Sequence, residues 1–208
     1  MSLDENEKND EIFTFINLEE ENKKNKNNMD GNSTWKELLN MLIYIGIVVI
    51  VSFLLITYVG QRTRVSGPSM MNTLHDGDNL IIDKISYRFK DPERFDIIVF
   101  NYLYKQNTHY IKRIIGLPGE TVQIIDSTIY INGEPLEEDY GLEPILAAKR
   151  ASDPITLGED EYFVLGDNRN NSSDSRELDV GNVKRDQIVG KAWLRIWPLD
   201  QIGFIKHE

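Results

Sequence analysis

The chain has 208 residues and no cysteine, and 34 acidic against 23 basic side chains give it a formal net charge of -11. This length can bury one real core but hardly two full domains. The lack of cysteine excludes disulfides, thiol catalysis and cysteine-bound zinc. The acidic balance argues against a nucleic-acid partner, because binding phosphates needs a basic face. With three histidines and no H-E-x-x-H motif, we expect no metal or other cofactor.

Residues 1–36 form a tail that is acidic at first and then rich in Asn and Lys. It has few apolar side chains, so packing cannot offset the entropy of ordering it, and we predict that the tail is disordered. Phe13, Phe15 and Ile16 are the exception. They are consistent with a transient helical turn or with a docking point for a partner.

Residues 37–60 predict a single transmembrane helix. Leu38–Val59 contains no charged residue, and some twenty residues at about 1.5 Å rise reach the ~30 Å of the hydrocarbon core. The run is too long, and lies behind too long a hydrophilic tail, for a cleaved signal peptide. Lys23, Lys24, Lys26 and Lys36 precede the span, and Arg62 and Arg64 follow it closely. This bias favours a cytoplasmic N-terminus and an extracytoplasmic C-terminal part.

Residues 61–208 predict a mostly β, antiparallel domain. Short apolar or alternating runs are separated by turn residues, and Asn132-Gly133 and Leu117-Pro118-Gly119 are strong turn signals. A small cap region is expected as an insertion at about 132–160, where residues 141–152 hold one helical turn or a loop. The predicted strands are Asn79–Asp83, Asp96–Phe100, Tyr110–Ile115, Thr121–Ile125, Thr128–Ile131, Tyr162–Leu165 and Ile188–Ile196.

Three stretches carry the chemistry-bearing side chains of this domain. SGPSMMNTL at residues 66–74 places a serine after a turn, YIKRIIG at 110–116 places a lysine among apolar residues, and GDNRNNSSDSR at 166–176 is dense in short polar side chains. Strand alternation puts Lys112 on one face and Arg113 on the other. Each stretch also has a purely structural interpretation: a loop serine facing water, an edge-strand lysine that prevents aggregation, and a solvated loop.

Taken together in this order, the stretches resemble the boxes of the type I signal peptidase (leader peptidase) family, the membrane-anchored Ser/Lys endopeptidases. SGPSMMNTL is similar to the nucleophile box, DIIVF at residues 96–100 to the short central strand box, YIKRIIGLPGE to the lysine box and GDNRNNSSDSR to the last box. The likeness covers roughly Thr63 to Trp197 and follows a single membrane span, as in the Gram-positive form.

The resemblance implies a role for each matching residue. Ser69 would be the nucleophile and Lys112 the general base, with Ser172 hydrogen-bonding and orienting the lysine. Met70 would help to wall the substrate pocket. The residues expected to form the supporting ion pairs are Asp174, Arg176, Arg113 and Asp167. The implied substrates are exported preproteins cut after small residues in an A-x-A pattern, and the implied partners are the lipid bilayer and the protein-export machinery.

Four positions differ from the residues most common in the family. Asn72 stands where proline is usual, Phe95 where glycine is frequent and Asn170 where aspartate is frequent. Gly67 stands where some members carry a serine that adds an oxyanion donor. The oxyanion hole would therefore depend on backbone N-H groups, that of Ser69 first. None of these departures removes a reacting group.

The chemistry requires a neutral lysine, because a serine hydroxyl is a weak nucleophile that needs a base within hydrogen-bond reach. The ordinary lysine pKa is near ~10.4, and lowering it by about three units costs on the order of 4 kcal/mol. Burial among Ile111, Ile114 and Ile115 is the expected cause of such a shift.

Three other classes of protein remain in view. A histidine-based hydrolase would use His75 or His109, but no G-x-S-x-G elbow surrounds Ser69. A soluble Ser/Lys autoprotease that regulates transcription would carry a DNA-binding helix pair in place of the span. An inactive, membrane-tethered binding protein of the same fold is the third alternative, because a fold does not prove activity.

Overall fold

The computed structural model describes residues 4–58 and 60–207, with side chains described at 13–24, 34–53 and 60–207. The chain divides into two compact units, Met1–Phe53 and Leu54–Glu208. The first unit is helical and the second is built on two β-sheets with long loops and short 3-10 helices.

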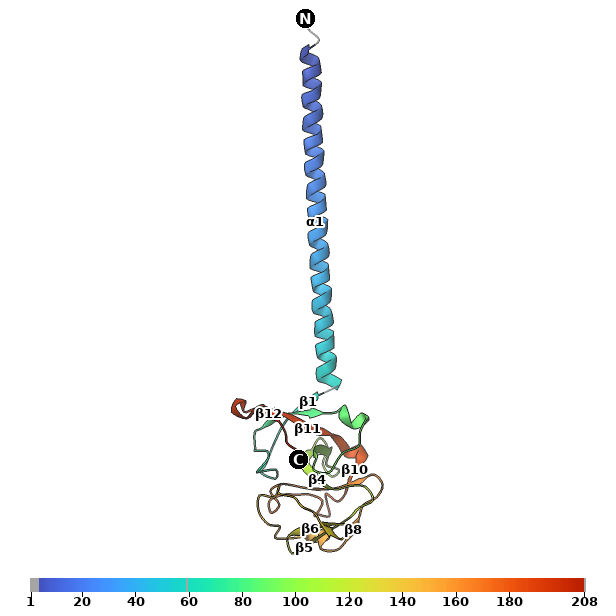
Figure 1. Ribbon diagram of the computed structural model, residues 1–208, viewed down its shortest axis with the longest axis vertical. Helices are drawn as coiled ribbons and strands as arrows, with labels where there is room; N and C mark the ends of the chain where they lie inside the picture. Colours follow the sequence, from blue (N-terminus) through green and yellow to red (C-terminus); the bar gives the residue numbers. More distant parts are fainter. Residues whose placement is uncertain (1–3, 59, 208) are drawn as a thin grey trace. The chain divides into compact units, whose positions relative to one another are not determined.

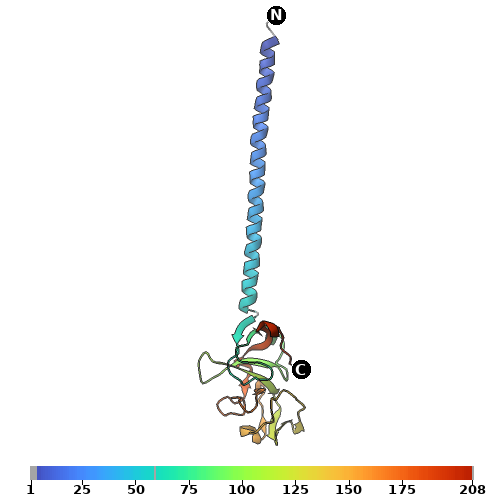
Figure 2. The same cartoon turned by 90° about the vertical axis from the view of Figure 1, so that its left-hand side faces the viewer.

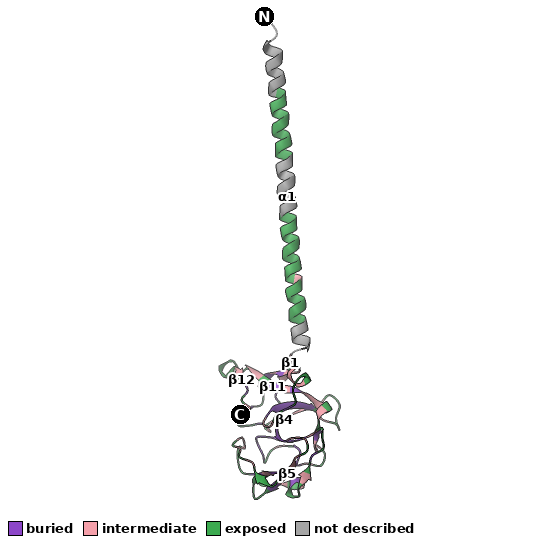
Figure 3. Cartoon of the chain, turned by 45° about the vertical axis from the view of Figure 1, so that its right-hand side comes forward, coloured by how far each residue is buried: buried purple, intermediate pink, exposed green. Residues whose placement is uncertain are grey.

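Helix α1 extends over Asp4–Tyr58 as one continuous element (Figures 1 and 2). Within it, Thr34–Phe53 is, among the described residues, the one segment long and apolar enough to cross a membrane by length and composition. Its described side chains are almost all exposed (Figure 3). An apolar helix whose side chains are exposed is suited to a lipid environment.

The predicted disorder of residues 1–36 differs from the structure, which continues the helix through residues 4–36. No proline occurs before Pro68, and Glu, Lys and Leu are good helix formers. Extending an existing helix also avoids the costly nucleation of a new one. The prediction considered packing alone and left out this propagation from the span.

The first sheet of the β unit has eight strands, and its hydrogen-bonded order is β1-β2-β11-β3-β4-β9-β10, with β12 beside β11. Every pairing in it is antiparallel. The strands are β1 Gly60–Arg64, β2 Asn79–Asp83, β3 Ile97–Asn101, β4 His109–Gly116, β9 Glu161–Leu165, β10 Val183–Lys184, β11 Ile188–Trp197 and β12 Gly203–Phe204. The predicted antiparallel β fold is confirmed, and β1, β10 and β12 are additional.

A second, four-stranded sheet has the order β7-β6-β5-β8 and lies at one end of the unit (Figure 1). Its strands are β5 Thr121–Ile125, β6 Thr128–Ile131, β7 Glu134–Pro135 and β8 Ile155–Thr156. The predicted Asn132-Gly133 turn joins β6 to β7, with φ of 53° and 85°. The expected insertion thus completes a sheet that begins earlier, at β5, and its helical turn is the 3-10 helix η2, Lys149–Ser152.

Short 3-10 helices and three apolar clusters complete the unit. The other 3-10 helices are η1 Ser86–Arg88, η3 Arg185–Gln187 and η4 Leu199–Gln201. One cluster joins the second sheet to β4 and β9 through residues such as Val122 and Phe163. Another holds Met70 and Leu74 against β2, β3 and β11. This second cluster fixes the segment that contains Ser69, because the side chains of Met70 and Leu74, which follow Ser69, are fully buried.

Candidate active site

Ser69 lies in the connection between β1 and β2, and two hydrogen-bonded turns shape this segment. The Met71 N-H donates to the Pro68 carbonyl oxygen at 3.0 Å, and the Leu74 N-H donates to that of Met70 at 2.8 Å. Gly67 has φ of 91°, a conformation that favours glycine. Ser69 itself is only partly buried. The sequence S-G-P-S therefore presents the Ser69 hydroxyl at the surface of a firmly anchored loop.

Lys112 reaches this hydroxyl from the middle of β4. Its Nζ donates to Ser69 Oγ at 2.8 Å and to the Ile111 carbonyl oxygen at 2.9 Å. Only 4% of Lys112 is exposed. Burial lowers its pKa from 10.5 to about 8, against the opposing effect of the carboxylates of Asp174 and Asp167. A substantial fraction of this amine is therefore neutral near physiological pH, and the neutral nitrogen can accept the Ser69 proton.

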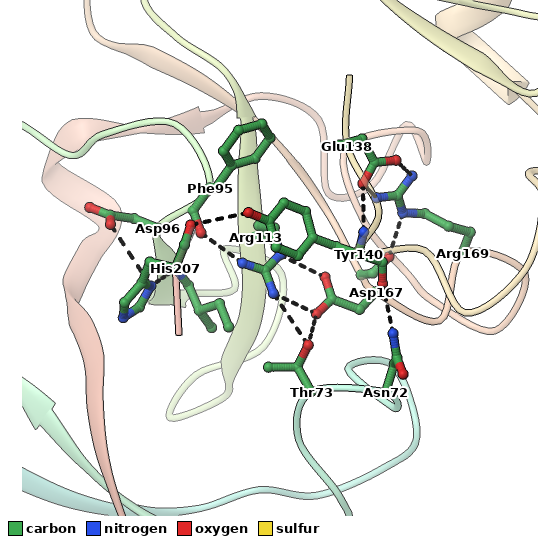
Figure 4. A network of polar contacts seen from close by, with 12 residues as sticks. Asn72, Thr73, Phe95, Asp96, Arg113, Glu138, Tyr140, Asp167, Arg169 and His207 are labelled. Atoms are coloured by element: carbon green, nitrogen blue, oxygen red, sulfur yellow. Dashed lines mark hydrogen bonds and ion pairs between the residues drawn. The ribbon is translucent and has the colours of Figure 1, made fainter. Parts of the chain in front are cut away.

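Arg113 points to the other side of β4, as strand alternation predicts. Its guanidinium forms a bidentate ion pair with Asp167, Nε to Oδ1 at 3.0 Å and Nη2 to Oδ2 at 2.8 Å. The two side chains are 1% and 0% exposed. Nη1 also donates to the Phe95 carbonyl oxygen at 2.9 Å, and Nη2 donates to Thr73 Oγ1 at 3.3 Å. Asp167 accepts in turn from Thr73 Oγ1 at 2.5 Å, so the pair joins β4 to the nucleophile segment (Figure 4).

The loop at residues 166–176 packs its backbone directly on the nucleophile segment. The Asn168 N-H donates to the Ser69 carbonyl oxygen at 3.0 Å, and its side-chain amide donates to that of Pro68 at 3.2 Å. Asp174 and Arg176 form a second bidentate pair inside this loop, with both N···O distances at 2.8 Å. Asp174 also accepts from the Gly166 N-H at 3.2 Å. The two buried ion pairs therefore hold the loop against Ser69.

Two predicted residues lie differently from what the resemblance implied. Ser172 Oγ is buried, but it has no hydrogen-bond partner among the described residues, and the Lys112 amine bonds Ser69 and Ile111 instead. Met70 is fully buried in the apolar cluster and does not line the groove at Ser69. The turn directs neighbouring side chains to opposite sides, so Met70 enters the core while Ser69 faces the groove.

An open groove of about 470 Å³ leads to the two reacting groups. It is lined by residues 63–69, residues 109–112, residues 170–173 and Val99. Ser172 belongs to this lining. The end of β1 and part of β4 thus border the groove, and extended backbone segments of this kind can bind a peptide in extended conformation.

The histidines do not serve Ser69 within the described residues, where the partner of its hydroxyl is Lys112. His75 and His109 are exposed. His207 accepts from the Ile97 N-H at 3.1 Å beside Asp96, and burial lowers its pKa to about 4. In the same part of the chain, no cluster of His, Asp and Glu suits a metal ion.

Sequence reasoning missed a second layer of contacts behind these groups. Arg169 forms a bidentate pair with Glu138, at 2.7 Å for both N···O distances, and Tyr140 stacks on Arg113. Thr73 bridges to Asp167. Nothing in the spacing of residues 138 and 140 marks them, because the chain brings them to the site only through the path of the insertion.

The fold and the site together define a β-rich domain in which a surface serine meets a buried lysine at the end of a peptide-sized groove. Residues 38–197 match the family described as signal peptidase, peptidase S26. The chain belongs to this family.

Individual relatives show the same likeness. The probable signal peptidase I-2 of Synechocystis sp. is 40% identical over 199 residues, which cover 92% of this chain and 86% of that protein. Signal peptidase I of Leptolyngbya laminosa is 43% identical over 166 residues, covering 76% and 79% of the two chains. A crystal structure of signal peptidase I from Enterococcus faecalis is 40% identical and covers 49% of this chain and 97% of its own, with a TM-score of 0.42.

Proposed function

We propose that this protein is a signal peptidase I, a membrane-tethered serine endopeptidase that removes signal peptides from exported preproteins. The observation that carries this proposal is the 2.8 Å contact between the Lys112 amine and the Ser69 hydroxyl, where burial lowers the pKa of the lysine to about 8. The family membership supports the reaction class, and the groove suits an extended peptide.

In the proposed mechanism, neutral Lys112 takes the proton of Ser69 as its oxygen attacks the carbonyl carbon of the scissile bond. The backbone N-H of Ser69 is assigned to the oxyanion. The Lys112 ammonium then returns the proton to the leaving amine, the carbon–nitrogen bond breaks, and an acyl-serine ester remains. Lys112 deprotonates a water that hydrolyses this ester, so that Ser69 and the neutral amine are regenerated.

The assigned substrates are preproteins with small residues before the cleavage site, in an A-x-A pattern. The helix suited to crossing a membrane supports action at the bilayer surface, where tethering raises the effective concentration of a membrane-bound substrate. We assign the N-terminus to the cytoplasm and the β unit to the outside, next to the protein-export machinery.

The decisive experiment uses the full chain in liposomes with an A-x-A preprotein, and mass spectrometry to locate the cut. Ser69→Ala and Lys112→Met should each lower the cleavage rate on the order of 1,000-fold or more, because both remove a reacting group. Ser152→Ala and Lys105→Met are matched controls, since both side chains are exposed. Wild-type protein that binds preproteins without cutting them would instead identify an inactive binding protein.

Orientation has a separate test, because the chain has no cysteine. A single Lys105→Cys variant should react with a membrane-impermeant maleimide in intact cells, and a Lys23→Cys variant should react only after lysis. The reverse pattern would exclude the proposed topology while leaving the peptidase activity in place.

A further inference from the structure

Tyr140 makes contacts with several segments behind the site, although it lies far from Ser69 in the chain. It follows β7 in the insertion, and Figure 4 places its ring between Phe95 and Arg113. Its hydroxyl donates to the His207 carbonyl oxygen at 3.4 Å. Its own carbonyl oxygen accepts from the Asn72 side-chain amide at 3.5 Å. Tyr140 thus connects the insertion with the nucleophile segment, with β4 and with His207 near the C-terminus.

The ring covers a face of the Arg113 guanidinium, which lies 3.7 Å from the ring centroid. The edges of that guanidinium are already occupied by Asp167, by the Phe95 carbonyl oxygen and by Thr73. An aromatic face attracts a cation, most strongly where water is excluded, and Arg113 is 1% exposed. The ring therefore limits movement of Arg113 perpendicular to its plane, a direction that the in-plane hydrogen bonds do not control.

Phe95 also contacts the Tyr140 ring. The two ring centroids are 5.0 Å apart at an interplanar angle of 48°. Phe95 has φ of 71°, which is unfavourable for a residue with a bulky side chain. Such a backbone conformation persists only where contacts with the surrounding structure stabilise it. Here those surroundings include the ring of Tyr140 and the Arg113 bond to the Phe95 carbonyl.

The constraint passes from Arg113 to both reacting groups. Arg113 is the neighbour of Lys112 in β4. Its partner Asp167 is followed by Asn168, whose N-H holds the Ser69 carbonyl oxygen at 3.0 Å. Asp167 also accepts from Thr73, four residues beyond Ser69. Displacement of the ion pair would therefore move the lysine strand and the serine loop relative to each other.

We propose that Tyr140 is a positioning residue for the peptidase reaction: its ring, packed between Phe95 and Arg113, keeps the Arg113–Asp167 pair in place and so fixes the spacing between Ser69 and Lys112. This inference rests on the proposed function. It assigns to the insertion a part in catalysis that involves no contact with substrate.

The test compares Tyr140→Leu, which removes the aromatic face, with Tyr140→Phe, which keeps it and removes only the hydroxyl. We expect Tyr140→Leu to lower kcat at least tenfold with KM within about threefold, and Tyr140→Phe to keep kcat within about twofold. Tyr130→Leu, in β6 of the second sheet, is the matched control because it removes a tyrosine ring away from Arg113, and it should leave kcat unchanged. All rates are measured well below the unfolding midpoint of each variant.

A second readout does not depend on cleavage. In a titration of 13C-labelled lysine followed by NMR, the Lys112 amine should titrate at higher pH in Tyr140→Leu than in wild type. The reason is that a displaced Arg113 leaves the Asp167 charge less compensated. Tyr140→Phe should titrate as wild type does. Loss of cleavage by wild type would overturn the proposed function and leave this comparison intact.

Either of two results would overturn the inference: equal losses of kcat in Tyr140→Leu and Tyr140→Phe, or an unchanged kcat and Lys112 titration in a folded Tyr140→Leu. If Tyr140→Leu does not fold, Phe95→Gly provides the test, because glycine tolerates the positive φ and removes only the supporting ring. It should lower kcat severalfold at temperatures well below its unfolding midpoint, and unchanged kcat in this variant would equally reject the role of the ring.

Discussion

The Lys112 amine lies 2.8 Å from the Ser69 hydroxyl and 2.9 Å from the carbonyl oxygen of its own neighbour, Ile111. The second contact restrains Nζ on the backbone of β4 and leaves the amine directed at a single hydroxyl. Because the reaction needs the neutral amine as its base, the protonation of Lys112 should control the rate, and because the amine is buried it should also affect the stability of the protein.

The rate of cleavage should increase with pH as Lys112 loses its proton. Its pKa is lowered by burial to about 8, so kcat/KM should rise nearly tenfold per pH unit well below that value and level off above it. The measurement is an initial-rate profile on the preprotein substrate, with enzyme integrity checked at each pH. A profile that is flat between pH values of about 6 and 9 would show that Lys112 is not the base.

Lys112→Met should stabilise the folded protein at neutral pH while abolishing activity. Burial depresses the folded-state pKa below the 10.5 of the unfolded chain, so the native state pays a protonation penalty that is complete below about 8 and disappears as pH rises through 10.5. The gain should be at most ~3 kcal/mol near neutral pH. Denaturant unfolding of wild type and variant at two pH values measures it, and a gain that grew with pH would contradict the assignment.

Gly166→Ala should disrupt the site by a steric clash, although it alters no reacting group. A Cβ at this position would lie 2.3 Å from Ser172 Oγ and 2.5 Å from the Ser69 carbonyl oxygen. We expect activity to fall on the order of 100-fold, because shifts near 1 Å at reacting groups have effects of this size. Gly203→Ala is the control, since its Cβ would meet nothing within 4 Å. Equal activity of the two variants would mean that the loop yields without moving Ser69.

Asp174→Asn should cost far more stability than loss of an exposed carboxylate. Asp174 and Arg176 are 0% and 1% exposed, and breaking such a buried pair costs roughly 3–5 kcal/mol. Glu177→Gln is the comparison, because its pair with Lys149 is about 39% and 36% exposed and should contribute under ~1 kcal/mol. Chemical denaturation of both variants decides between them, and similar losses would rule out a structural role for the buried pair.

The sequence was sufficient to predict most of the fold, because its strands have clear boundaries. Short alternating or apolar runs, bounded by the turn residues Gly, Pro, Asn and Asp, predicted β2, β5 and β6 with the observed ends. The short strands β10 and β12 were missed because two residues cannot establish a period. The continuous helix before the span was missed because its stability does not come from a packed face.

The reacting pair was predictable because both residues stand in distinctive local patterns. The hydrogen-bond partners around Lys112 were not predictable in the same way. The family resemblance implied a hydrogen bond between Ser172 and Lys112, whereas the amine donates to the Ile111 carbonyl oxygen instead. Met70 was expected at the pocket because it adjoins Ser69, but the turn reverses its direction. Tyr140 and Glu138 depend on how a long insertion folds back on the site, and no local spacing encodes that path.

The location of the reacting groups on the first sheet and its loops alone has a consequence for engineering. The residues assigned to the reaction belong to the first sheet and its loops, whereas the insertion contacts the supporting residues Arg169 and Arg113 through Glu138 and Tyr140, which lie between β7 and η2. A foreign recognition element grafted at the Asp126-Ser127 turn, which joins β5 to β6, would leave both contacts in place. Loop tips of this kind tolerate added sequence well. A new binding specificity can therefore be added at the second sheet without altering the residues assigned to the reaction.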